Sequence, residues 1–391
     1  MERLVTSNLK LGIIAGGQLG KMLIQDASKW DIITYVMDMD EQCPSRNVAS
    51  VFVKGNPQNF DDVYNFGKKV DFLTFELENI NVDALLKLKS EGLQIAPDPE
   101  ILNLIQDKGL QKEFYKKYNI PTSPFILLQS KDEIINAVLN GDLKFPFVQK
   151  LRKGGYDGRG VSIINNEIDF NELLDGPSVI EKKINIIKEI AIIIARNKNG
   201  EIKCFPPVDM IFEPKANLVK MLVCPSNISK EQSSKAEQIA SYIAECLKIE
   251  GLLAVEFFID NNGELFVNES APRPHNSGHH TIESIVTSQF EQHLRAILNL
   301  PLGSTKLKLP AVMINLLGEE GFSGNVFYEG LTESMSIEGV KIHLYGKKIT
   351  KPFRKMGHVT VIDNDINEAI KKAEYVQSVI KVKSWKQNTL V

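Results

Sequence analysis

The sequence predicts a mixed α/β fold that is divided into more than one domain. The chain has 391 residues, which is too long for one simple hydrophobic core. Its first hundred residues alternate strand-like and helix-like apolar patterns, as parallel β-α-β units do. Further along, two apolar runs are joined by the turn 261–263, Asn-Asn-Gly, which is typical of an antiparallel hairpin.

The N-terminal segment carries the clearest β-α-β pattern. Strands are expected at 11–15, at 33–37 and at 70–75, and a helix with apolar residues at 3–4 spacing follows the first strand. The glycine-rich turn 16–20 lies between that strand and that helix. It is either a tight structural turn or an anion-binding turn of the dinucleotide type, since N–H groups at a helix N-terminus favour anions. Ala15 stands where the first glycine of the dinucleotide fingerprint belongs, and Asp38 lies near the position of a ribose-binding acid.

Proline-rich and glycine-rich boundaries at 96–99 and 300–304 suggest three domains, 1–100, 101–300 and 301–391. A formal charge of −3 gives no basic field that would indicate nucleic acid binding. The longest apolar run, 190–195, is far too short to span a membrane. Four scattered cysteines indicate a reducing compartment, so the cytoplasm is expected.

The predicted hairpin carries two carboxylates where a core strand would carry apolar residues. Glu256 lies in the first run and Glu269 in the second, with Asn268 beside it. Buried carboxylates are unfavourable unless a cation neutralises them. An all-oxygen set of this kind suits Mg²⁺ that bridges to phosphates rather than zinc.

A glycine-rich loop follows the strand expected at 145–150, which ends in Lys150. Four of the seven positions 154–160 are glycine, and Lys153 and Arg159 add positive charge. Glycines at this density favour close approach of backbone N–H groups to a polyphosphate, in a loop that can open and close. The alternative is a mobile surface hairpin.

Of three further polar segments, two admit two interpretations each. The segment 179–184 with Glu189 is either an adenine and ribose site or a solvated charged turn. The basic cluster 347–355 is either a phosphate anchor or a solvated face. The loop 271–280, rich in histidine and fixed by prolines, follows the hairpin directly and suggests a phosphoryl-transfer site. His293 lies among apolar residues at helical spacing and is expected to be structural.

Together these motifs resemble the ATP-grasp superfamily, and more closely the 5-(carboxyamino)imidazole ribonucleotide synthase family. The resemblance runs almost from end to end, and its order is more specific than any single glycine motif. The segments that carry it are 16–22, 75–79, 106–108, 120–122, 150–160, 268–278 and 287–296. One departure is Phe212, in a region where relatives often carry a polar side chain, and no role is transferred to it.

The resemblance implies an ATP-grasp fold with a Rossmann-like N-terminal domain and a small C-terminal domain. The ATP-binding residues it implies are Lys108, Lys150, Gly155, Tyr156, Gly158, Gly160, Glu181, Lys182, Lys183, Ile184, Glu189, Asn268 and Glu269. The substrate-binding residues it implies are Gln18, Leu19, Glu76, Asn79, Tyr156, Asp157, Arg159, Lys347, Arg354 and Lys355. The catalytic residues it implies are Asp157, Arg159, Arg273, His275 and Asn276, and the metal ligands are Glu256 and Glu269.

The implied reaction is the ATP- and bicarbonate-dependent carboxylation of the exocyclic amine of 5-aminoimidazole ribonucleotide, through carboxyphosphate, in purine biosynthesis. Mg²⁺ is the implied metal, with Mn²⁺ as a substitute, and a homodimer is expected. Alternatives are another ATP-grasp ligase that joins a different acid and amine, such as a formyl-transferring purine enzyme, or a non-catalytic nucleotide-binding regulator. A further alternative, a dinucleotide-dependent dehydrogenase, is supported only by the N-terminal glycines. Ala15 and the predicted metal-binding hairpin argue against it.

Overall fold

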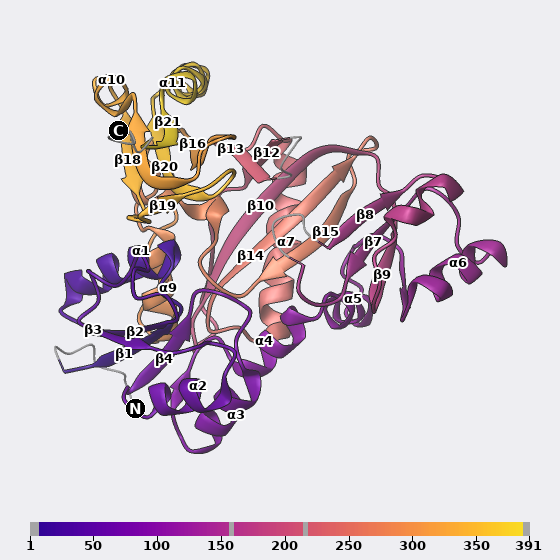
Figure 1. The fold of residues 1–391 in the computed structure, drawn as a ribbon, viewed down its shortest axis with the longest axis horizontal. Coiled ribbons are helices and arrows are strands. Elements are labelled where there is room, and N and C mark those ends of the chain that lie inside the picture. The colour runs from indigo at the N-terminus through magenta and orange to yellow at the C-terminus, as the bar shows by residue number, and fades with distance from the viewer. Residues whose placement is uncertain (1–7, 156–159, 214–217, 386–391) are drawn as a thin grey trace, which may run out of the picture.

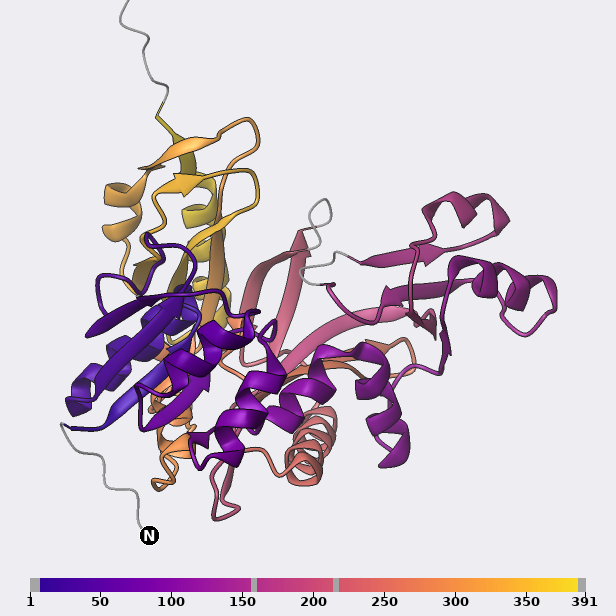
Figure 2. The same ribbon diagram turned by 60° about the horizontal axis from the view of Figure 1, so that its bottom comes forward.

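The computed structural model describes residues 8–155, 160–213 and 218–385. It has the predicted mixed α/β class, with an N-terminal layered part, a long central sheet, a small lobe at one end and a C-terminal part (Figure 1). Turning the molecule brings the N-terminal part forward and shows the small lobe standing away from it (Figure 2). No helix within the described ranges is both long and apolar enough to cross a membrane.

The N-terminal part is a parallel five-stranded sheet with the order β3-β2-β1-β4-β5. One apolar cluster contains residues of α1, and a second contains residues of α2 and α3, as the β-α-β pattern predicts. The elements here are β1 (Lys10–Ile14), α1 (Gln18–Ala27), β2 (Ile33–Asp38), β3 (Val51–Lys54), α2 (Phe60–Gly67), β4 (Phe72–Phe75), α3 (Val82–Ser90) and β5 (Gln94–Ile95).

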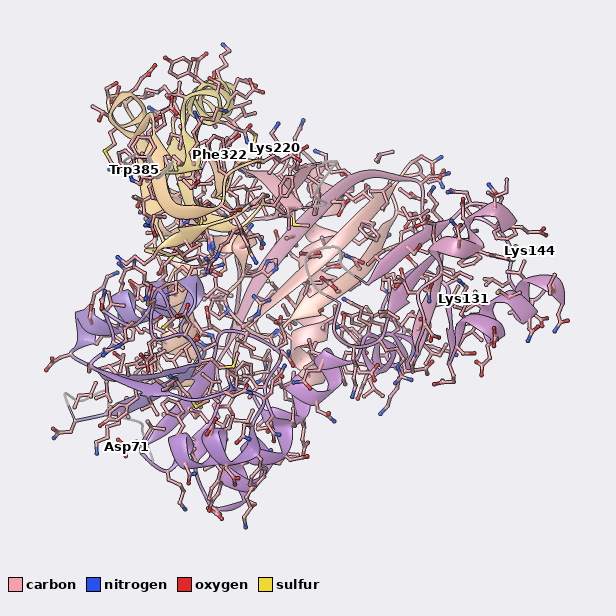
Figure 3. The ribbon with its side chains drawn as sticks, viewed as in Figure 1. Asp71, Lys131, Lys144, Lys220, Phe322 and Trp385 are labelled. Carbon is pink, nitrogen blue, oxygen red and sulfur yellow. The ribbon has the colours of Figure 1, made fainter. Side chains whose placement is uncertain are left out.

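Two helices lead from this part into a small antiparallel lobe with the strand order β6-β9-β7-β8. Lys144 lies at the outer end of the lobe (Figure 3). The elements are α4 (Pro99–Gln106), α5 (Lys108–Lys117), β6 (Phe125–Leu128), α6 (Lys131–Leu139), β7 (Phe147–Leu151), β8 (Val161–Ile164) and β9 (Ser178–Lys182). The strand expected at 145–150 is therefore β7, which begins two residues later.

The central sheet follows the path β15-β14-β10-β12-β13-β16-β20-β18, and β11 pairs with β10. The apolar face of α7 packs on it over the largest core cluster. The predicted hairpin is present as β14 and β15. The elements up to the end of this part are β10 (Ile186–Arg196), β11 (Ile202–Cys204), β12 (Val208–Glu213), β13 (Leu218–Cys224), α7 (Lys230–Leu247), β14 (Gly251–Asp260), β15 (Leu265–Ala271), α8 (Thr281–Ser284) and α9 (Gln289–Ile297).

The C-terminal part has an apolar cluster under α11. Three of its strands form a separate three-stranded sheet, whereas the others continue the central sheet. β16 pairs with β13, so the central sheet continues into β20 and β18. The elements are β16 (Ala311–Leu317), β17 (Gly324–Glu329), α10 (Leu331–Met335), β18 (Val340–Leu344), β19 (Ile349–Thr350), β20 (Lys355–Ile362), α11 (Ile366–Val379) and β21 (Lys381–Ser384). This continuity was not expected from the boundary at 300–304.

Candidate active site

The two carboxylates of the hairpin lie opposite each other. Glu256 on β14 and Glu269 on β15 are direct register partners, although the next pair along is Phe257 and Val267. The register shift leaves Asn268 as the extra residue of a β-bulge, a feature that often re-aims side chains beside active sites. The Asn268 amide reaches Glu256 Oε2 at 3.4 Å. The bulge therefore brings all three oxygen-bearing side chains together, as the sequence predicted.

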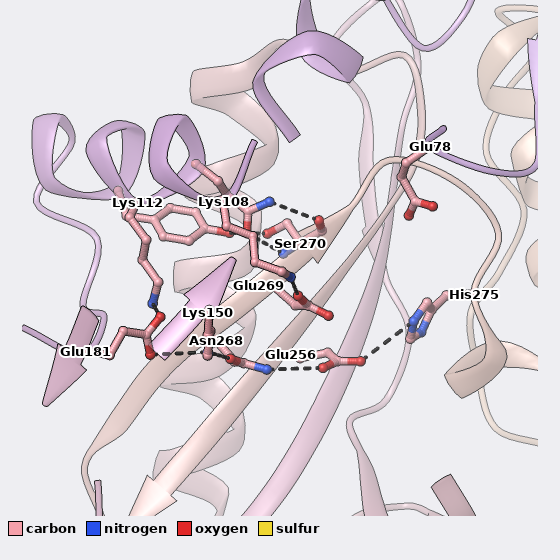
Figure 4. Close-up of polar contacts among 12 residues, drawn as sticks. Glu78, Lys108, Lys112, Lys150, Glu181, Glu256, Asn268, Glu269, Ser270 and His275 are labelled. Atoms are coloured by element: carbon pink, nitrogen blue, oxygen red, sulfur yellow. Dashed lines mark hydrogen bonds and ion pairs between the residues drawn. The ribbon is translucent and has the colours of Figure 1, made fainter. Parts of the chain in front are cut away.

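Lysines of two other elements approach this oxygen cluster (Figure 4). Lys108, the first residue of α5, forms an ion pair with Glu269 and lowers the pKa of that carboxyl to about 2. Lys150 of β7 donates to Asn268 Oδ1 at 2.7 Å. Burial raises the pKa of Glu256 to about 8, and the nearby carboxylates add to this increase. Two cations and a pair of carboxylates thus meet where the lobe and α5 approach the central sheet.

The donor set fits a magnesium ion that is completed by substrate. Mg²⁺ is commonly held by one or two carboxylates, with phosphate and water oxygens filling the other positions. Within the described ranges no group of three or more His, Cys, Asp and Glu side chains is arranged to hold a metal. Glu256 and Glu269 would therefore hold the ion only together with phosphate oxygens, beside the two lysines that attract the same phosphates.

The side chain of Glu181, a residue that the resemblance places at the adenine, is held by two lysines. The carboxylate is 2% exposed and lies between the ammonium groups of Lys112, at 3.1 Å, and Lys150, at 3.2 Å. Burial favours the neutral acid, but Lys150 and Lys112 overcome it and lower the pKa of Glu181. Only the backbone of Glu181 remains for contact with a base.

The residues that follow Glu181 do line a pocket. Lys182, Lys183 and Ile184 border a space of about 270 Å³, which Phe266 and the turn 260–262 close from the hairpin side. This volume is small for a whole nucleotide and adequate for a base. Glu189 lies on β10, opposite Phe258, and burial raises its pKa to about 7.

The loop after the hairpin places a guanidinium and an imidazole beside the carboxylates. Arg273 pairs with Glu78 at 2.7 Å, and His275 Nε2 lies 3.6 Å from Glu256 Oε1. Arg273 Nε and Asn276 Nδ2 are buried and have no hydrogen-bond partner among the described residues. Buried donors are normally satisfied, so two of them in one loop indicate a polar or anionic ligand. Two of the three predicted catalytic residues of this loop, Arg273 and His275, therefore lie near the carboxylates of the hairpin.

The N-terminal glycine turn is satisfied by carboxylates of the chain itself. The Gly16 N–H donates to Asp38 Oδ2 at 2.7 Å, and the N–H groups of Gly17 and Gly20 donate to Glu76 at 2.5 and 2.8 Å. These contacts occupy the anion site at the start of α1, which argues against dinucleotide binding here.

The side chains of two predicted substrate residues, Glu76 and Leu19, have partners within the chain itself. Glu76 is 7% exposed, and each of its oxygens accepts from an N–H group of the turn, so a contact with substrate would be made in addition to these two hydrogen bonds. The side chain of Leu19 is buried in the apolar cluster with Met22, so it offers no side-chain contact to a substrate. Gln18 is half-buried and Asn79 is exposed.

The basic cluster lies beside the N-terminal part. Lys21 of α1 donates to the carbonyl oxygens of Leu344 and Tyr345 at 3.0 and 3.3 Å, directly before Lys347. Lys347 in turn donates to the backbone carbonyl of Lys355 at 2.8 Å. Arg354 donates to Ile349 O at 2.5 Å, on the more exposed side. The glycine turn and the cluster are therefore neighbours, although more than 300 residues separate them in the sequence.

Tyr156, Asp157, Gly158 and Arg159 lie outside the described residues; Gly155 and Gly160 flank them. Sequence reasoning missed three polar residues of the site, namely Glu78, Lys112 and Gln289. Glu78 lies inside a motif that carries the resemblance, and Lys112 follows Lys108 by one helical turn, so both had a usable signal. Gln289 also lies inside a segment that carries the resemblance, 287–296, but its position at the start of a helix gave no separate signal for a role in the site.

Three family models match the chain. They are the ribonucleotide synthetase preATP-grasp domain over residues 9–106, the ATP-grasp domain over 113–290 and the phosphoribosylaminoimidazole carboxylase C-terminal domain over 311–372. Among curated relatives, the N5-carboxyaminoimidazole ribonucleotide synthase of Staphylococcus aureus (strain COL) is 38% identical over 364 residues, 92% of this chain and 94% of the relative. The enzyme of the same name from Bacillus subtilis (strain 168) is 35% identical over 95% of this chain and 96% of its own.

Solved structures of enzymes with the same name are also similar to this chain. The N5-carboxyaminoimidazole ribonucleotide synthetase of Thermotoga maritima has a TM-score of 0.89 and 44% identity, covering 96% of this chain and 100% of that chain. The enzyme of Aspergillus clavatus, in complex with ADP and 5-aminoimidazole ribonucleotide, has a TM-score of 0.87 and 30% identity, covering 95% of this chain and 99% of that chain. The chain therefore belongs to the N5-carboxyaminoimidazole ribonucleotide synthase family, ATP-dependent ligases of the ATP-grasp fold.

Proposed function

We propose that the chain carboxylates the exocyclic amine of 5-aminoimidazole ribonucleotide with bicarbonate and ATP, which gives 5-carboxyaminoimidazole ribonucleotide, ADP and phosphate. The family assignment supports the overall reaction. The roles of individual residues below are our own proposals, argued from contacts in the cleft.

Lys108 and Lys150 bind the phosphates of ATP. Both ammonium groups already lie at the oxygen cluster of the hairpin, where an arriving triphosphate would compete for them. Glu256 and Glu269 would hold Mg²⁺, which would supply positive charge beside the transferred phosphoryl group. The base lies against 182–184 in the small pocket, and Glu189 accepts from the ribose hydroxyls.

Arg273 and Asn276 hold bicarbonate. Their unpartnered buried N–H groups would donate to its oxygens and keep it next to the γ-phosphate. A bicarbonate oxygen then attacks the γ-phosphorus and the bond to ADP breaks, which leaves carboxyphosphate. Donors that are fixed before the reaction stabilise charge on both reactants without reorganisation.

The ribonucleotide binds with its phosphate at Lys347, Arg354 and Lys355. Carboxyphosphate loses phosphate to give CO₂, the amine attacks that carbon, and one amine proton leaves. The loop around 156–159 is proposed to cover the cleft and exclude water, which would hydrolyse the intermediate. Asp157 and His275 are the candidate bases, and His275 is the one that the structure describes next to Glu256.

The observation that carries the proposal is the direct pairing of Glu256 with Glu269 beside two unsatisfied donors. The test is ADP release measured with and without each substrate, together with transfer of ¹³C from labelled bicarbonate to the product. We expect fast ADP release only with all three substrates, and one labelled carbon per ADP. Fast release with another amine, or with formate in place of bicarbonate, would point instead to a different ATP-grasp ligase. Nucleotide binding without turnover would indicate a regulator.

We also propose the domain limits 1–100, 101–300 and 301–391, a homodimer, and a location in the cytoplasm. The four cysteines are free thiols, which is in line with a reducing compartment. Sedimentation analysis of the purified chain would test the dimer.

A further inference from the structure

A third lysine lies behind the two that face the cleft. Lys112 is one helical turn beyond Lys108 on α5, and its side chain is 3% exposed. Its ammonium donates to Thr122 Oγ1 at 2.5 Å and lies 3.1 Å from Glu181 Oε1. Because it is buried behind Glu181, it cannot itself reach a nucleotide in the cleft (Figure 4).

Glu181 is shared between this buried lysine and a lysine of the cleft. Its second oxygen lies 3.2 Å from Lys150, whose ammonium also donates to Asn268. A buried carboxylate with one counterion holds that counterion strongly, because separating them leaves an uncompensated charge. With two counterions, one can be released while the other keeps the carboxylate neutralised.

We propose that Lys112 is a positioning residue for Lys150: it neutralises Glu181 from the buried side, so that Lys150 remains available to a phosphate of the nucleotide. The inference rests on the proposed role of Lys150 in ATP binding. It assigns Glu181 a place in the phosphate site instead of the adenine site.

The charge balance supports this assignment. In the structure Lys108 pairs with Glu269, while Lys112 and Lys150 share Glu181. When Mg²⁺ and phosphates take Glu269, Lys108 and Lys150, Lys112 is the cation left in contact with Glu181. A neutral side chain at position 112 would leave Lys150 as the nearest counterion of that carboxylate.

The test is Lys112→Met, which keeps the length and the apolar stem but removes the charge. We expect the KM for ATP and the Kd for ADP with Mg²⁺ to rise roughly ten- to a hundredfold, as expected for a charged contact to phosphate. The KM for the ribonucleotide should stay within about twofold. Lys116→Met is the matched control, since Lys116 is exposed one turn further along α5 and should leave every constant unchanged.

A second variant separates charge neutralisation from simple packing. Lys112→Met with Glu181→Gln removes both members of the pair and leaves no buried charge, so nucleotide affinity should recover at least tenfold relative to the single variant. Unchanged ADP affinity in a folded Lys112→Met protein would overturn the inference, and so would a double variant that is no better than the single one. Equal increases in both KM values would also overturn it. ADP binding is measured without carboxylation, so a failure of the proposed reaction gives a different result from a failure of this inference.

Discussion

The side chain of Gln289 holds the catalytic loop, and its removal makes a sharp prediction. At the start of α9, with 0% exposure, its amide accepts from His275 N–H at 2.9 Å and donates to His275 C=O at 2.8 Å. Gln289→Leu deletes both of these partly buried hydrogen bonds. An unsatisfied buried polar group costs about 1–3 kcal/mol, so the unfolding free energy should fall by roughly 2–6 kcal/mol.

The same helix provides a matched control. Gln292 is also fully buried. Its amide forms the same pair of hydrogen bonds with Gly303, accepting from the Gly303 N–H at 2.8 Å and donating to the Gly303 C=O at 3.0 Å. Gln292→Leu should therefore lose similar stability. Only Gln289→Leu should lower kcat, by roughly a hundredfold, because displacement of a reacting group by about 1 Å has effects of that size.

The assays are urea unfolding followed by tryptophan fluorescence, and steady-state ADP release under conditions where both variants are folded. Equal effects of the two substitutions on kcat would refute the reasoning, since they would reflect loss of stability alone. Full kcat in Gln289→Leu would show that the position of His275 does not depend on this clamp.

Four further outcomes are expected. Glu269→Gln should remove most turnover, with a loss of several kcal/mol of transition-state stabilisation, while the melting temperature stays near that of the wild type. Hydrogen exchange in the loop 154–160 should slow when an ATP analogue and Mg²⁺ bind. Arg354→Ala should raise the KM for the ribonucleotide roughly ten- to a hundredfold and leave the KM for ATP nearly unchanged, whereas Lys351→Ala should change neither. Burial lowers the pKa of His293 from 6.5 to about 3, so its contribution to stability is present above pH 6.5 and is lost as the pH falls, and His293→Gln should lessen this acid slope by about 1.4 kcal/mol per pH unit.

A specific result would contradict each of these four predictions. Near-normal ADP release by Glu269→Gln at ordinary Mg²⁺ concentration would show that Glu269 is not a metal ligand. Unchanged exchange at saturating analogue would argue against a loop that covers phosphates. Equal losses for both substrates in Arg354→Ala would indicate general destabilisation. An acid slope that is the same in His293→Gln and in the wild type would show that this imidazole is not held neutral.

The periodic parts of the fold and the oxygen cluster could be predicted from the sequence. The hairpin could be recognised because its turn and the two carboxylates within its apolar runs are local features of the sequence. The structure has this hairpin as β14 and β15. The β-bulge at Asn268 was not visible, because a register shift depends on how two strands align and not on either strand alone.

What the sequence could not supply was the partner of each polar side chain. Glu181 and Lys112 are 69 positions apart, and no periodic pattern links them. Glu76 was assigned to substrate on resemblance, whereas the nearest hydrogen-bond donors of its carboxylate are N–H groups 56 and 59 positions away. Such pairings follow from the packing of whole elements, which apolar spacing alone does not determine.

The ladder between β13 and β16 has a consequence for the spacing of the two proposed sites. Through it, the strand that begins at Lys355 and the hairpin of Glu256 belong to one hydrogen-bonded sheet, whereas Lys150 belongs to the separate lobe. Motion of the lobe would change the nucleotide site and leave the spacing between the phosphate anchor and the carboxylates as it is. The distance between the start of β20 and the hairpin of Glu256 is therefore set by backbone hydrogen bonds within one sheet and not by the position of the lobe.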